Sequence, residues 1–503
     1  MPIQDKPITG GPAFLMRLQQ RVRQMSGRAQ AVALMACGAL STFALAPFGL
    51  MPVMFLTVPA LFLLTDGFVG QRAGIAAVRR GFIAGWCFGF GYFVFGLWWL
   101  AAALLQDAVH FAWAIPFAVL GFPAYLALYY GFALALAVPF FRWRGLRFLA
   151  VALAIGLGEW LRGYIFTGFP WNALGYTAVP TPLFMQSVRL VGLFGLSGLC
   201  VVVFAAPLMW LERRLLVFCL ALGLFVADLG YGGFRLGTAP AAQSAHETVV
   251  RMVQPASDIA SWGSIEGREA AFASLMALSS APPNGGTRVP DIIVWPETAL
   301  PFLIDDRADA RTAIGEMLKP GQTLITGATR FAGRDDDGMP QFHNSIVVLN
   351  DDGQIVSAAD KVHLVPFGEY LPFAKTLKAF GLGFISTIAG NYVPGVERNL
   401  LLLPDGMTLF PLICYEAVFP GIVGAQSGLS DALLNVSFDS WFSGTPGPYQ
   451  HFAEARLQAV AVGKPLIRVG ENGVSAVVDA YGRVIGRLSF GEKGYLDVAI
   501  SLP

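Results

Sequence analysis

The sequence predicts a polytopic α-helical membrane region followed by an α/β domain, and three observations lead to this expectation. The chain has 503 residues, which is long enough for more than one domain. Its composition is 55% hydrophobic and only 13% charged, whereas roughly 25% of the residues of an average soluble protein are charged. Long apolar runs occupy residues 29–231, and from about residue 232 onward short apolar and polar stretches alternate.

Seven apolar segments are candidates for membrane-spanning helices, since a span needs about 20 apolar residues. A cleaved signal peptide is the alternative for the first segment, and the further spans argue against it. We divide the chain into a basic cytoplasmic N-terminus (1–28), a transmembrane region (29–231), a linker (232–247) and a folded domain (248–503). The predicted spans are 29–46, 51–66, 81–105, 111–140, 147–166, 184–211 and 214–231.

Arginines gather on one side of the predicted membrane region. They occur in the N-terminal segment and after the second, fourth and sixth spans, and short loops rich in lysine and arginine face the cytoplasm. With seven spans the chain leaves the membrane on the opposite side, so we expect residues 248–503 outside the cytoplasm. The arginines of the three loops are Arg72, Arg79, Arg80, Arg142, Arg144, Arg147, Arg213 and Arg214.

Two features stand out at the outer end of the fifth span. Glu159 and Arg162 are charged residues in an apolar segment, where charge is costly unless it is paired or lies near the interface. We favour an i,i+3 ion pair at the level of the lipid headgroups. The next segment, residues 166–172, is aromatic and contains helix breakers, which indicates either an ordinary aromatic belt or a lipid-facing floor beneath the folded domain.

The pattern in residues 248–503 predicts strands that alternate with helices, which is typical of an α/β fold or a layered α-β sandwich. An Asn350-Asp351-Asp352-Gly353 turn predicts a hairpin between two of the strands. Helices are expected at 266–278, 308–318 and 448–462. Strands are expected at 249–253, 291–294, 323–328, 345–349, 354–358, 409–414, 432–436, 466–469, 475–479 and 483–487.

Cys414 differs from the other four cysteines, because it alone lies outside the long apolar runs. It ends a predicted strand and is followed directly by Tyr415 and Glu416, which leaves two interpretations open, a nucleophile or a buried structural thiol. Five cysteines without paired spacing indicate neither a disulfide framework nor a zinc site. The net charge of +1 gives no electrostatic support for a nucleic-acid partner. The cysteines interpreted as packing residues are Cys37, Cys87, Cys200 and Cys219.

Three reactive groups follow predicted strands directly, at the positions where α/β sheets gather their functional sites. These groups are the carboxylate of Glu297, the ammonium of Lys361 and the thiol of Cys414. A thiol needs a base to attack as thiolate, and a buried glutamate with a raised pKa is suitable. A fixed ammonium stabilises the oxyanion that the attack creates. His363 is a rival base, which we rank below Glu297 because a packed histidine is the commoner case.

These segments resemble the Glu-Lys-Cys triad of the nitrilase superfamily, which implies a layered α-β-β-α sandwich for residues 248–503. With the preceding spans and three further motifs, the chain resembles the bacterial apolipoprotein N-acyltransferases over nearly its whole length. The triad segments are Trp295-Pro296-Glu297, Lys361 with Val365-Pro366-Phe367-Gly368-Glu369, and Cys414-Tyr415-Glu416. The further motifs are Phe169-Pro170-Trp171, Asn435-Val436-Ser437 and Trp441-Phe442.

The resemblance implies a reaction without a cofactor or a metal, at the periplasmic side of the bacterial inner membrane. Cys414 would take a fatty acyl chain from a phospholipid, typically phosphatidylethanolamine, as a thioester. The chain would then pass to the α-amino group of a diacylglyceryl-cysteine apolipoprotein. Glu297 would be the base and Lys361 the oxyanion stabiliser. The supporting residues implied are Glu369 and Glu416, which would orient Lys361 and assist proton transfer, and Tyr415, Trp262 and Trp441, which border the acyl chain or pack in the core.

The sequence also departs from the family pattern. Gln254-Pro255-Ala256-Ser257 occupies the place of a Gln-x-Asn segment, and Phe438-Asp439-Ser440-Trp441-Phe442 that of Asn-Asp-Ala-Trp-Phe. Gly470-Glu471-Asn472-Gly473 replaces a usual Asn-Asn-Gly. The last residues before Pro503 lack the apolar pattern of the final spanning helix that most members carry.

Two other functions compete with the acyltransferase. A membrane-anchored nitrilase-like amidase would use the same triad and pass the acyl group to water, although seven spans are of no use for soluble substrates. A transporter with an inert outer domain is poorly supported, because the spans contain few charges beyond Glu159, Arg162 and Asp228.

Residues 369–391, between Lys361 and Cys414, contain many apolar side chains and glycines. One interpretation is a loop packed on the domain's own core. The other is a mobile lid that touches the bilayer, admits the lipid chain and keeps water from the thioester, with Phe380 in contact with the acyl chain.

The distribution of arginines predicts the location of the folded domain. A reporter enzyme fused after Gly237 is expected to have the activity of a periplasmic fusion, because seven spans place that point outside the cytoplasm. A fusion after Arg80, in a predicted cytoplasmic loop, is the control and should give the opposite signal. Cytoplasmic activity of the Gly237 fusion would remove one span from the predicted count.

Overall fold

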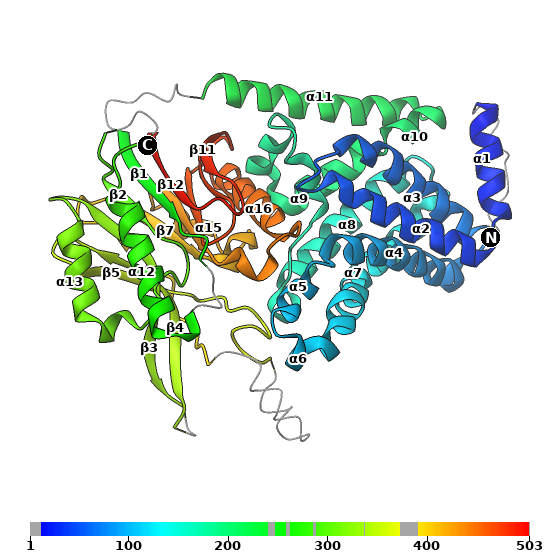
Figure 1. The fold of residues 1–503 in the computed structure, drawn as a ribbon. Coiled ribbons are helices and arrows are strands. Elements are labelled where there is room, and N and C mark those ends of the chain that lie inside the picture. The colour runs from blue at the N-terminus through cyan, green and yellow to red at the C-terminus, as the bar shows by residue number, and fades with distance from the viewer. Residues whose placement is uncertain are drawn as a thin grey trace. The chain divides into compact units, whose positions relative to one another are not determined.

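The computed structural model describes residues 12–239, 247–257, 262–284, 288–335, 338–372 and 391–501. The chain forms two compact units (Figure 1). The helical unit consists of Met1–Ala239 together with Gly444–Leu457, and the α/β unit consists of Pro240–Ser443 and Gln458–Pro503. The sequence pattern assigned residues 444–457 to the folded domain, whereas their contacts assign them to the helical unit.

Six helical stretches among the described residues are long and apolar enough to cross a membrane. The first predicted span, 29–46, forms a helix of 15 residues and a short turn, so it is helical but shorter than these six. The count of seven spans therefore stays a prediction. The six stretches are Met51–Val69, Gly74–Leu97, Ala108–Arg142, Leu146–Thr167, Phe184–Leu211 and Leu215–Gly237. The α-helices are α1 (Ala13–Gln24), α2 (Gly27–Ser41), α3 (Met54–Val69), α4 (Gly74–Leu97), α5 (Leu100–Leu105), α6 (Ala108–Phe111), α7 (Phe122–Ala137), α8 (Leu146–Tyr164), α9 (Val188–Phe204), α10 (Ala206–Leu211) and α11 (Leu215–Gly237).

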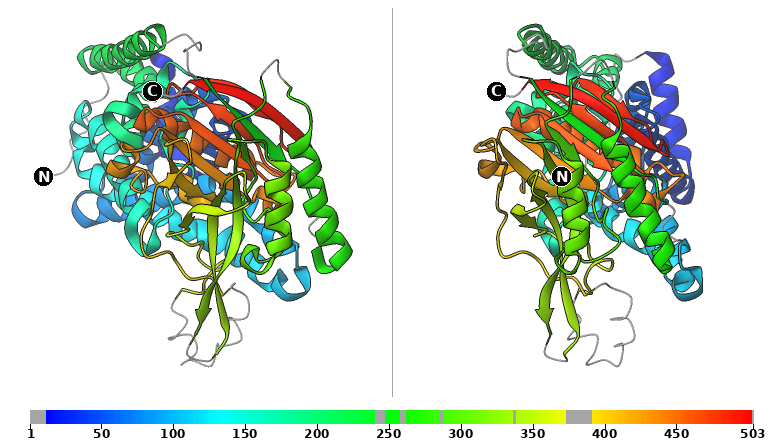
Figure 2. Two further views of the ribbon diagram at one scale, coloured as in Figure 1. Left: turned by 90° about the vertical axis from the view of Figure 1, so that its left-hand side faces the viewer. Right: turned by 60° about the vertical axis from the view of Figure 1, so that its left-hand side comes forward.

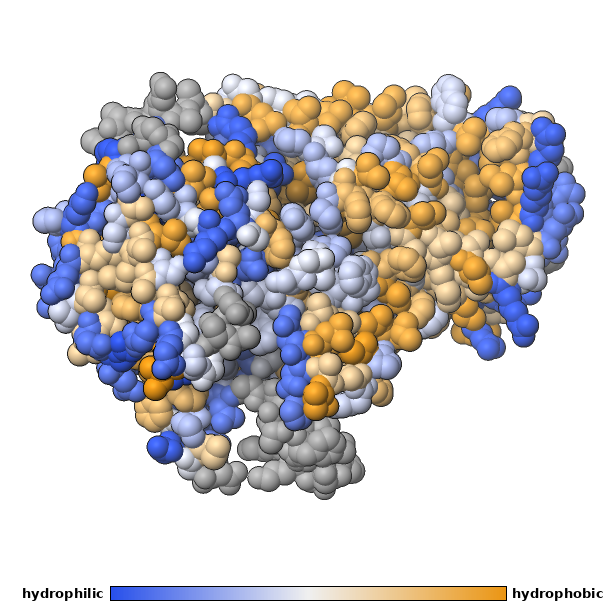
Figure 3. Space-filling view, in the orientation of Figure 1, coloured by the Kyte–Doolittle hydropathy of each residue, from blue (hydrophilic) through white to orange (hydrophobic). Residues whose placement is uncertain are grey.

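The outward faces of these helices are apolar. Phe132 on α7, Leu153 on α8 and Leu216 on α11 expose 59%, 66% and 75% of their surface. Figure 3 shows hydrophobic residues gathered over the visible face of the helical unit. A helix at a water-facing surface would place polar residues there, so this surface fits the lipid contact of a multi-pass membrane protein.

Helix α4 packs against both α2 and α7, and glycines allow the close approach. A Cβ atom at Gly38 of α2 would lie 2.0 Å from the carbonyl oxygen of Phe88 on α4. A Cβ atom at Gly85 of α4 would lie 2.2 Å from the carbonyl oxygen of Tyr130 on α7. Even alanine at these positions would push the helices apart, which is the packing that small residues provide in membranes.

Glu159 and Arg162 are buried inside the helical unit, with 0% and 1% of their surface exposed. The Glu159 carboxylate accepts hydrogen bonds from the Tyr130 hydroxyl at 2.7 Å and from the Leu174 amide at 2.8 Å. Arg162 donates to the carbonyl oxygens of Phe169 and Trp171. The predicted ion pair between the two residues is therefore wrong, because each side chain binds groups of the loop that follows α8.

Residues 444–457 complete this polar interior with the first turns of α16 (Gly447–Val462). The side-chain oxygen of Gln450 accepts hydrogen bonds from the indole nitrogens of Trp99 and Trp171, at 3.1 and 3.0 Å, and from the Asn172 amide group at 3.2 Å. The Glu454 carboxylate accepts a further bond from the Asn172 backbone at 2.9 Å. The predicted lipid-facing floor is thus wrong for Trp171 and Asn172, which are 4% and 1% exposed.

The α/β unit contains two six-stranded sheets, with the orders β12-β1-β2-β3-β4-β5 and β11-β10-β9-β8-β7-β6. Strand β1 pairs in parallel with β2 and β2 with β3, and β7, β8 and β9 are also parallel neighbours. The strands are β1 (Glu247–Gln254), β2 (Ile292–Val294), β3 (Thr323–Arg334), β4 (Pro340–Leu349), β5 (Ile355–Asp360), β6 (Leu401–Leu402), β7 (Thr408–Ile413), β8 (Ala432–Ser437), β9 (Leu466–Gly470), β10 (Ser475–Val478), β11 (Val484–Leu488) and β12 (Gly494–Ser501).

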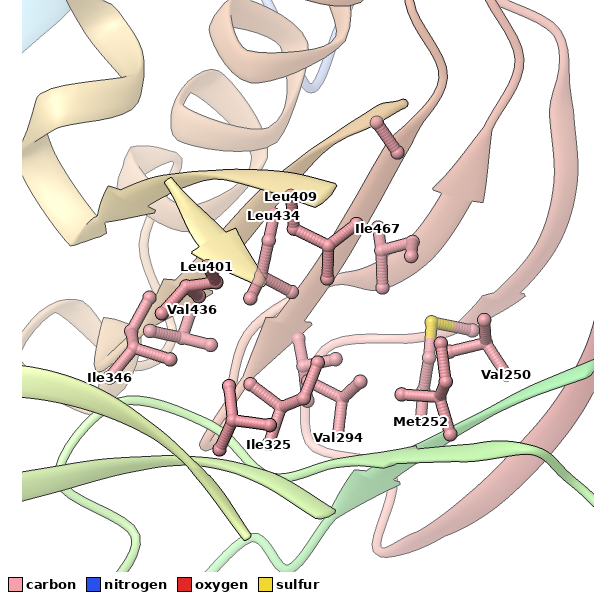
Figure 4. Close-up of a cluster of buried hydrophobic side chains, with 14 of the residues drawn as sticks. Val250, Met252, Val294, Ile325, Ile346, Leu401, Leu409, Leu434, Val436 and Ile467 are labelled. Atoms are coloured by element: carbon pink, nitrogen blue, oxygen red, sulfur yellow. The ribbon is translucent and has the colours of Figure 1, made fainter. Parts of the chain in front are cut away.

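The two sheets pack face to face over an aliphatic core, because alternate residues of each strand point inward. Figure 4 shows this core. The other face of the first sheet is covered by α12 (Ile265–Ser280) and α13 (Ala308–Met317), as Figure 2 shows. The core residues labelled in Figure 4 are Val250, Met252, Val294, Ile325 and Ile346 of the first sheet and Leu401, Leu409, Leu434, Val436 and Ile467 of the second.

The predicted architecture, a polytopic helical region with a layered α/β domain, is confirmed. The sequence pattern missed β12, which pairs antiparallel along the whole of β1. A buried ion pair of 2.7 Å between Arg251 of β1 and Asp497 of β12 joins these two strands. Arg251 also donates to the carbonyl oxygens of Ser279 and Ala281 at 2.6 Å, so it satisfies carbonyl groups at the end of α12 as well.

Candidate active site

Three strand ends bring Glu297, Lys361 and Cys414 together inside the α/β unit. Glu297 follows β2, Lys361 follows β5 and Cys414 follows β7. The Lys361 nitrogen lies 3.5 Å from a Glu297 oxygen, and the thiol of Cys414 forms a hydrogen bond with the Glu297 carboxylate. Glu297 and Lys361 are 4% and 1% exposed, so the cluster is largely shielded from water.

Cys414 begins a 3-10 turn (Cys414–Val418) with a φ of 51°, in the left-handed region that a non-glycine residue rarely adopts. The amide group of Asn435 on β8 donates to the carbonyl oxygens of Leu412 at 2.8 Å and of Cys414 at 3.4 Å. The Ser437 hydroxyl lies 3.6 Å from the Cys414 sulfur. The strained turn presents the thiol to the cluster, and β8 supports it from the side.

A buried arginine fixes these two residues of β8. Arg468 on β9 is fully buried, donates to the side chain of Asn435, and forms an ion pair of 2.7 Å with Asp439. Asp439 also accepts a hydrogen bond of 2.7 Å from the Ser437 hydroxyl. The residues beside the Cys414 thiol therefore belong to one charge-assisted network.

Glu416 ties the turn to the segment that carries Lys361. One carboxylate oxygen accepts the backbone N–H groups of Val362 and His363, each at 2.9 Å, and the other accepts that of Ile413 at 2.9 Å. Arg398 forms an ion pair with the same carboxylate at 2.6 Å. Although burial alone would raise the pKa of Glu416, these hydrogen bonds and Arg398 lower it overall, so Glu416 remains ionised.

Glu369 and Asn344 complete the surroundings of Lys361. The Glu369 carboxylate accepts hydrogen bonds from Lys361 at 2.9 Å, from the Asn344 amide group at 2.9 Å and from the Val365 backbone at 2.8 Å. The same amide group of Asn344 donates to Glu297 at 2.7 Å. Asn344 was not predicted, and its signal in the sequence is the polar pair Asn344-Ser345 directly before the apolar run Ile346–Leu349 of β4.

Burial shifts the pKa of each of the three groups toward its neutral form, and the neighbouring charges add to this shift or oppose it. It raises the pKa of Glu297, against the opposing charge of Lys361, and it raises the pKa of the Cys414 thiol, which the neighbouring Glu297 raises further. Burial alone would lower the pKa of Lys361, but the carboxylates of Glu369 and Glu297 raise it overall. Burial therefore favours the neutral forms of the Glu297 carboxyl and the Cys414 thiol, while the two carboxylates favour the ammonium form of Lys361.

The predicted aromatic residues fall into two groups. Trp262 and Trp441 both lie near Phe438, with ring centroids 6.4 and 5.7 Å from that of Phe438. Tyr415 and His363 belong to a second cluster, in which the rings lie 4.8 and 4.2 Å from that of Phe419. Burial lowers the pKa of His363, so its ring is neutral and packs against aromatic side chains.

The predicted lid falls on residues 369–391, of which 373–390, including Phe380, lie outside the described residues. Glu369 and Asn391, at the two ends of the segment, are described. Within the described part of the chain, no group of three or more His, Cys, Asp or Glu side chains is arranged to hold a metal ion.

Two family models match this chain. Residues 37–206 match the model of the apolipoprotein N-acyltransferase N-terminal domain, and residues 250–503 match that of carbon-nitrogen hydrolase. The apolipoprotein N-acyltransferase of Agrobacterium fabrum (strain C58) is 45% identical over 96% of this chain and 92% of its own length. The chain belongs to the apolipoprotein N-acyltransferase family.

A second relative agrees with this assignment. The apolipoprotein N-acyltransferase of Brucella melitensis biotype 1 is 44% identical over 97% of this chain and 93% of its own length. Among solved structures, the chain is similar to the crystal structure of a carbon-nitrogen hydrolase from Helicobacter pylori G27, with 18% identity and a TM-score of 0.36, over 51% of this chain and 90% of that chain. As a member of the N-acyltransferase family, the protein is an acyltransferase within the carbon-nitrogen hydrolase superfamily.

Gly327 on β3 determines where Glu297 lies in this N-acyltransferase. A Cβ atom at Gly327 would lie 2.5 Å from the Glu297 Cα atom and 2.5 Å from the Pro296 carbonyl oxygen. Gly327→Ala is therefore expected to displace Glu297 and to slow alkylation of Cys414 by iodoacetamide by up to about 100-fold, since a shift near 1 Å in a catalytic group has that effect. Mass spectrometry of the alkylated protein measures the rate.

Gly494→Ala is the matched control, because a Cβ atom at Gly494 meets nothing within 4 Å. It should alkylate at the wild-type rate. A wild-type rate in Gly327→Ala as well would contradict the role of this close contact.

Proposed function

We propose that this N-acyltransferase transfers a fatty acyl chain from a phospholipid, through a thioester on Cys414, to the α-amino group of the N-terminal diacylglyceryl-cysteine of an apolipoprotein. The observation that supports this most is the hydrogen bond between the Cys414 thiol and the buried Glu297, beside the ammonium of Lys361. A nucleophile, a base and a cation within one shielded cluster suit acyl transfer. The apolar helical unit suits a donor that resides in a membrane.

In the first half-reaction, Cys414 attacks the ester carbonyl carbon of the phospholipid. Its proton passes to Glu297 as the sulfur–carbon bond forms, and Lys361 stabilises the negative charge on the carbonyl oxygen. The carbon–oxygen bond of the ester then breaks. The lysophospholipid oxygen leaves with the proton from Glu297, and the acyl chain remains on sulfur.

In the second half-reaction, the α-amino group of the apolipoprotein attacks the thioester carbonyl carbon. Lys361 again stabilises the oxyanion, and Glu297 takes a proton from the attacking nitrogen. The carbon–sulfur bond breaks, the thiol regains its proton and the amide product leaves. Glu297 thus alternates between base and acid, which its raised pKa favours.

The remaining residues hold or shape this site. Glu369 and Asn344 orient Lys361 and Glu297 through their shared hydrogen bonds. Trp262 and Trp441, whose rings both lie near that of Phe438, provide apolar surface for the acyl chain. We place the α/β unit at the periplasmic side of the inner membrane, with phosphatidylethanolamine as the donor.

Intact mass after incubation with phospholipid tests the proposed chemistry. The wild-type protein should gain the mass of one acyl chain, and Cys414→Ala should gain none, because the nucleophile is missing. Replacement of Cys37, Cys87, Cys200 or Cys219 by Ala is the control and should leave the added mass unchanged. Acyl transfer at the wild-type rate by Cys414→Ala would overturn the nucleophile assignment.

The same reaction mixture separates the acyltransferase from a hydrolase that uses the same triad. With a diacylglyceryl-cysteine peptide present, the acyltransferase should release the acyl chain as an amide of that peptide. The match to carbon-nitrogen hydrolases supports hydrolysis as the alternative. Release as free fatty acid alone would favour that alternative.

The pH dependence of thioester formation tests Glu297. A base works only when it is deprotonated, so the rate should rise with pH through the raised pKa of Glu297. In Glu297→Gln this rise should disappear, and the rate should fall by about 10²–10⁴-fold, as is typical for loss of a general base. An unchanged pH profile in Glu297→Gln, measured by burst kinetics with a small ester, would assign the base to another group.

A further inference from the structure

The side chain of Asn344 has one polar atom that the triad does not use. Its amide nitrogen donates to the carboxylates of Glu297 and Glu369, at 2.7 and 2.9 Å. Asn344 is only 4% exposed, its side-chain carbonyl oxygen is buried too, and among the described residues no donor reaches that oxygen. Because a buried acceptor without a donor is costly in a folded protein, this oxygen is better explained by a donor that a substrate brings.

Thr329 and Tyr392 lie on the same face of the first sheet as Asn344. Thr329 on β3 is paired directly with Asn344 on β4, and opposite residues of an antiparallel pair have Cβ atoms about 4.5–5.5 Å apart. Tyr392 forms a bridge with Phe342, through backbone hydrogen bonds of 3.0 and 2.9 Å from Phe342 to the residues on either side of Tyr392. Phe342 and Asn344 are two residues apart in one strand, so their side chains share a face. Ile346, the next residue on that face, belongs to the core between the two sheets.

The Tyr392 hydroxyl lies close to the polar groups of the triad. It is 3.5 Å from the hydroxyl oxygen of Thr329. Burial raises the pKa of Tyr392, the contact with Thr329 opposes this shift, and the carboxylates of Glu369 and Glu297 add to it. The hydroxyl is therefore protonated and uncharged, and it lies within electrostatic reach of both carboxylates. Its oxygen can still accept a hydrogen bond from a further donor.

The second half-reaction brings a group with two N–H bonds to this place. A neutral primary amine attacks the thioester carbon with its lone pair, so neither N–H bond points at that carbon. One N–H group faces Glu297, which takes its proton. The nitrogen becomes positively charged as the carbon–nitrogen bond forms, which makes the other N–H group a stronger donor that needs an acceptor. The phospholipid ester of the first half-reaction has no N–H group at its reacting atoms.

We propose that the side-chain carbonyl oxygen of Asn344 and the hydroxyl of Tyr392 form a subsite for the acceptor amine, where they accept the second N–H group of the apolipoprotein's α-amino group. This inference rests on the proposed function. The proton that Glu297 takes returns to the thiol sulfur when the carbon–sulfur bond breaks, and the second N–H group remains in the amide product. Tyr392 therefore acts in transfer of the acyl chain and not in formation of the thioester. Thr329 is a positioning residue, because it acts through the Tyr392 hydroxyl.

Separate measurement of the two half-reactions tests the proposal on the full-length protein in detergent. The burst of p-nitrophenol from p-nitrophenyl butyrate reports formation of the thioester on Cys414. Intact mass and the amide product then report transfer from the preformed thioester to an added diacylglyceryl-cysteine peptide. Tyr392→Phe should slow this transfer by about tenfold, because one hydrogen bond to a nitrogen that becomes charged is lost. The burst rate should stay within about twofold of the wild-type rate.

Two further variants serve as controls. Tyr495→Phe makes the same chemical change on β12, where the tyrosine hydroxyl donates to the Pro282 carbonyl oxygen at 2.9 Å, and it should alter neither rate. Thr329→Val removes the hydroxyl beside Tyr392 and nearly keeps the side-chain shape. Alone it should slow transfer by less than Tyr392→Phe does, and in the Tyr392→Phe background it should have no further effect.

The outcomes separate this inference from the proposed function. If the wild-type protein forms no thioester, or forms it and passes the acyl group only to water, the proposed function and this inference both fail. If the wild-type protein makes the amide and Tyr392→Phe slows both half-reactions equally, only the first, or neither, Tyr392 does not bind the acceptor amine. In that case this inference alone is overturned.

Discussion

The ammonium of Lys361 lies between the carboxylates of Glu297 and Glu369, and the candidate site depends on this buried contact. Both carboxylates accept hydrogen bonds from the single amide group of Asn344, so they lie close together. Two neighbouring carboxylates repel each other unless a cation compensates their charge. Loss of the cation would leave buried charge unpaired, which costs roughly 3–5 kcal/mol. The pairing of β3, β4 and β5, and the apolar core behind them, keep these side chains at the required distances.

The turn at Cys414 is the second constraint, because a left-handed conformation at a non-glycine residue costs on the order of 1–3 kcal/mol. Glu416 offsets this cost by accepting three backbone N–H groups and by pairing with Arg398. A carboxylate with a lowered pKa and both oxygens occupied is suited to holding the turn at Cys414 in place. Proton transfer is better suited to Glu297, whose pKa is shifted in the opposite direction.

Local sequence pattern predicted the elements that carry the site, because buried strands with polar ends have a clear signature. Glu297, Lys361 and Cys414 were found in this way. Asn344 was missed because its role depends on which strand lies beside which, and long-range pairing leaves no local pattern. The strand β12 was missed for the same reason, because it pairs with β1 at the other end of the domain sequence. Glu159 and Arg162 were wrongly predicted to pair with each other, because their contacts with the loop after α8 leave no local pattern either. The departures from the family pattern at Ser257, Ser440 and Glu471 looked independent in the sequence, but their atoms meet at one carboxylate.

The three donors on the side-chain oxygen of Gln450 have a consequence for biosynthesis. Trp99, Trp171 and Asn172 belong to helices and loops made early, whereas Gln450 belongs to a segment made after residues 240–443. At about 5–20 residues per second, translation of the intervening residues takes roughly 10–40 s. During that interval these groups lack Gln450 as an acceptor, while Trp99 and Asn172 can still donate to the carbonyl oxygen of Gly96. The helical unit therefore reaches its final form only after most of the α/β unit has been synthesised.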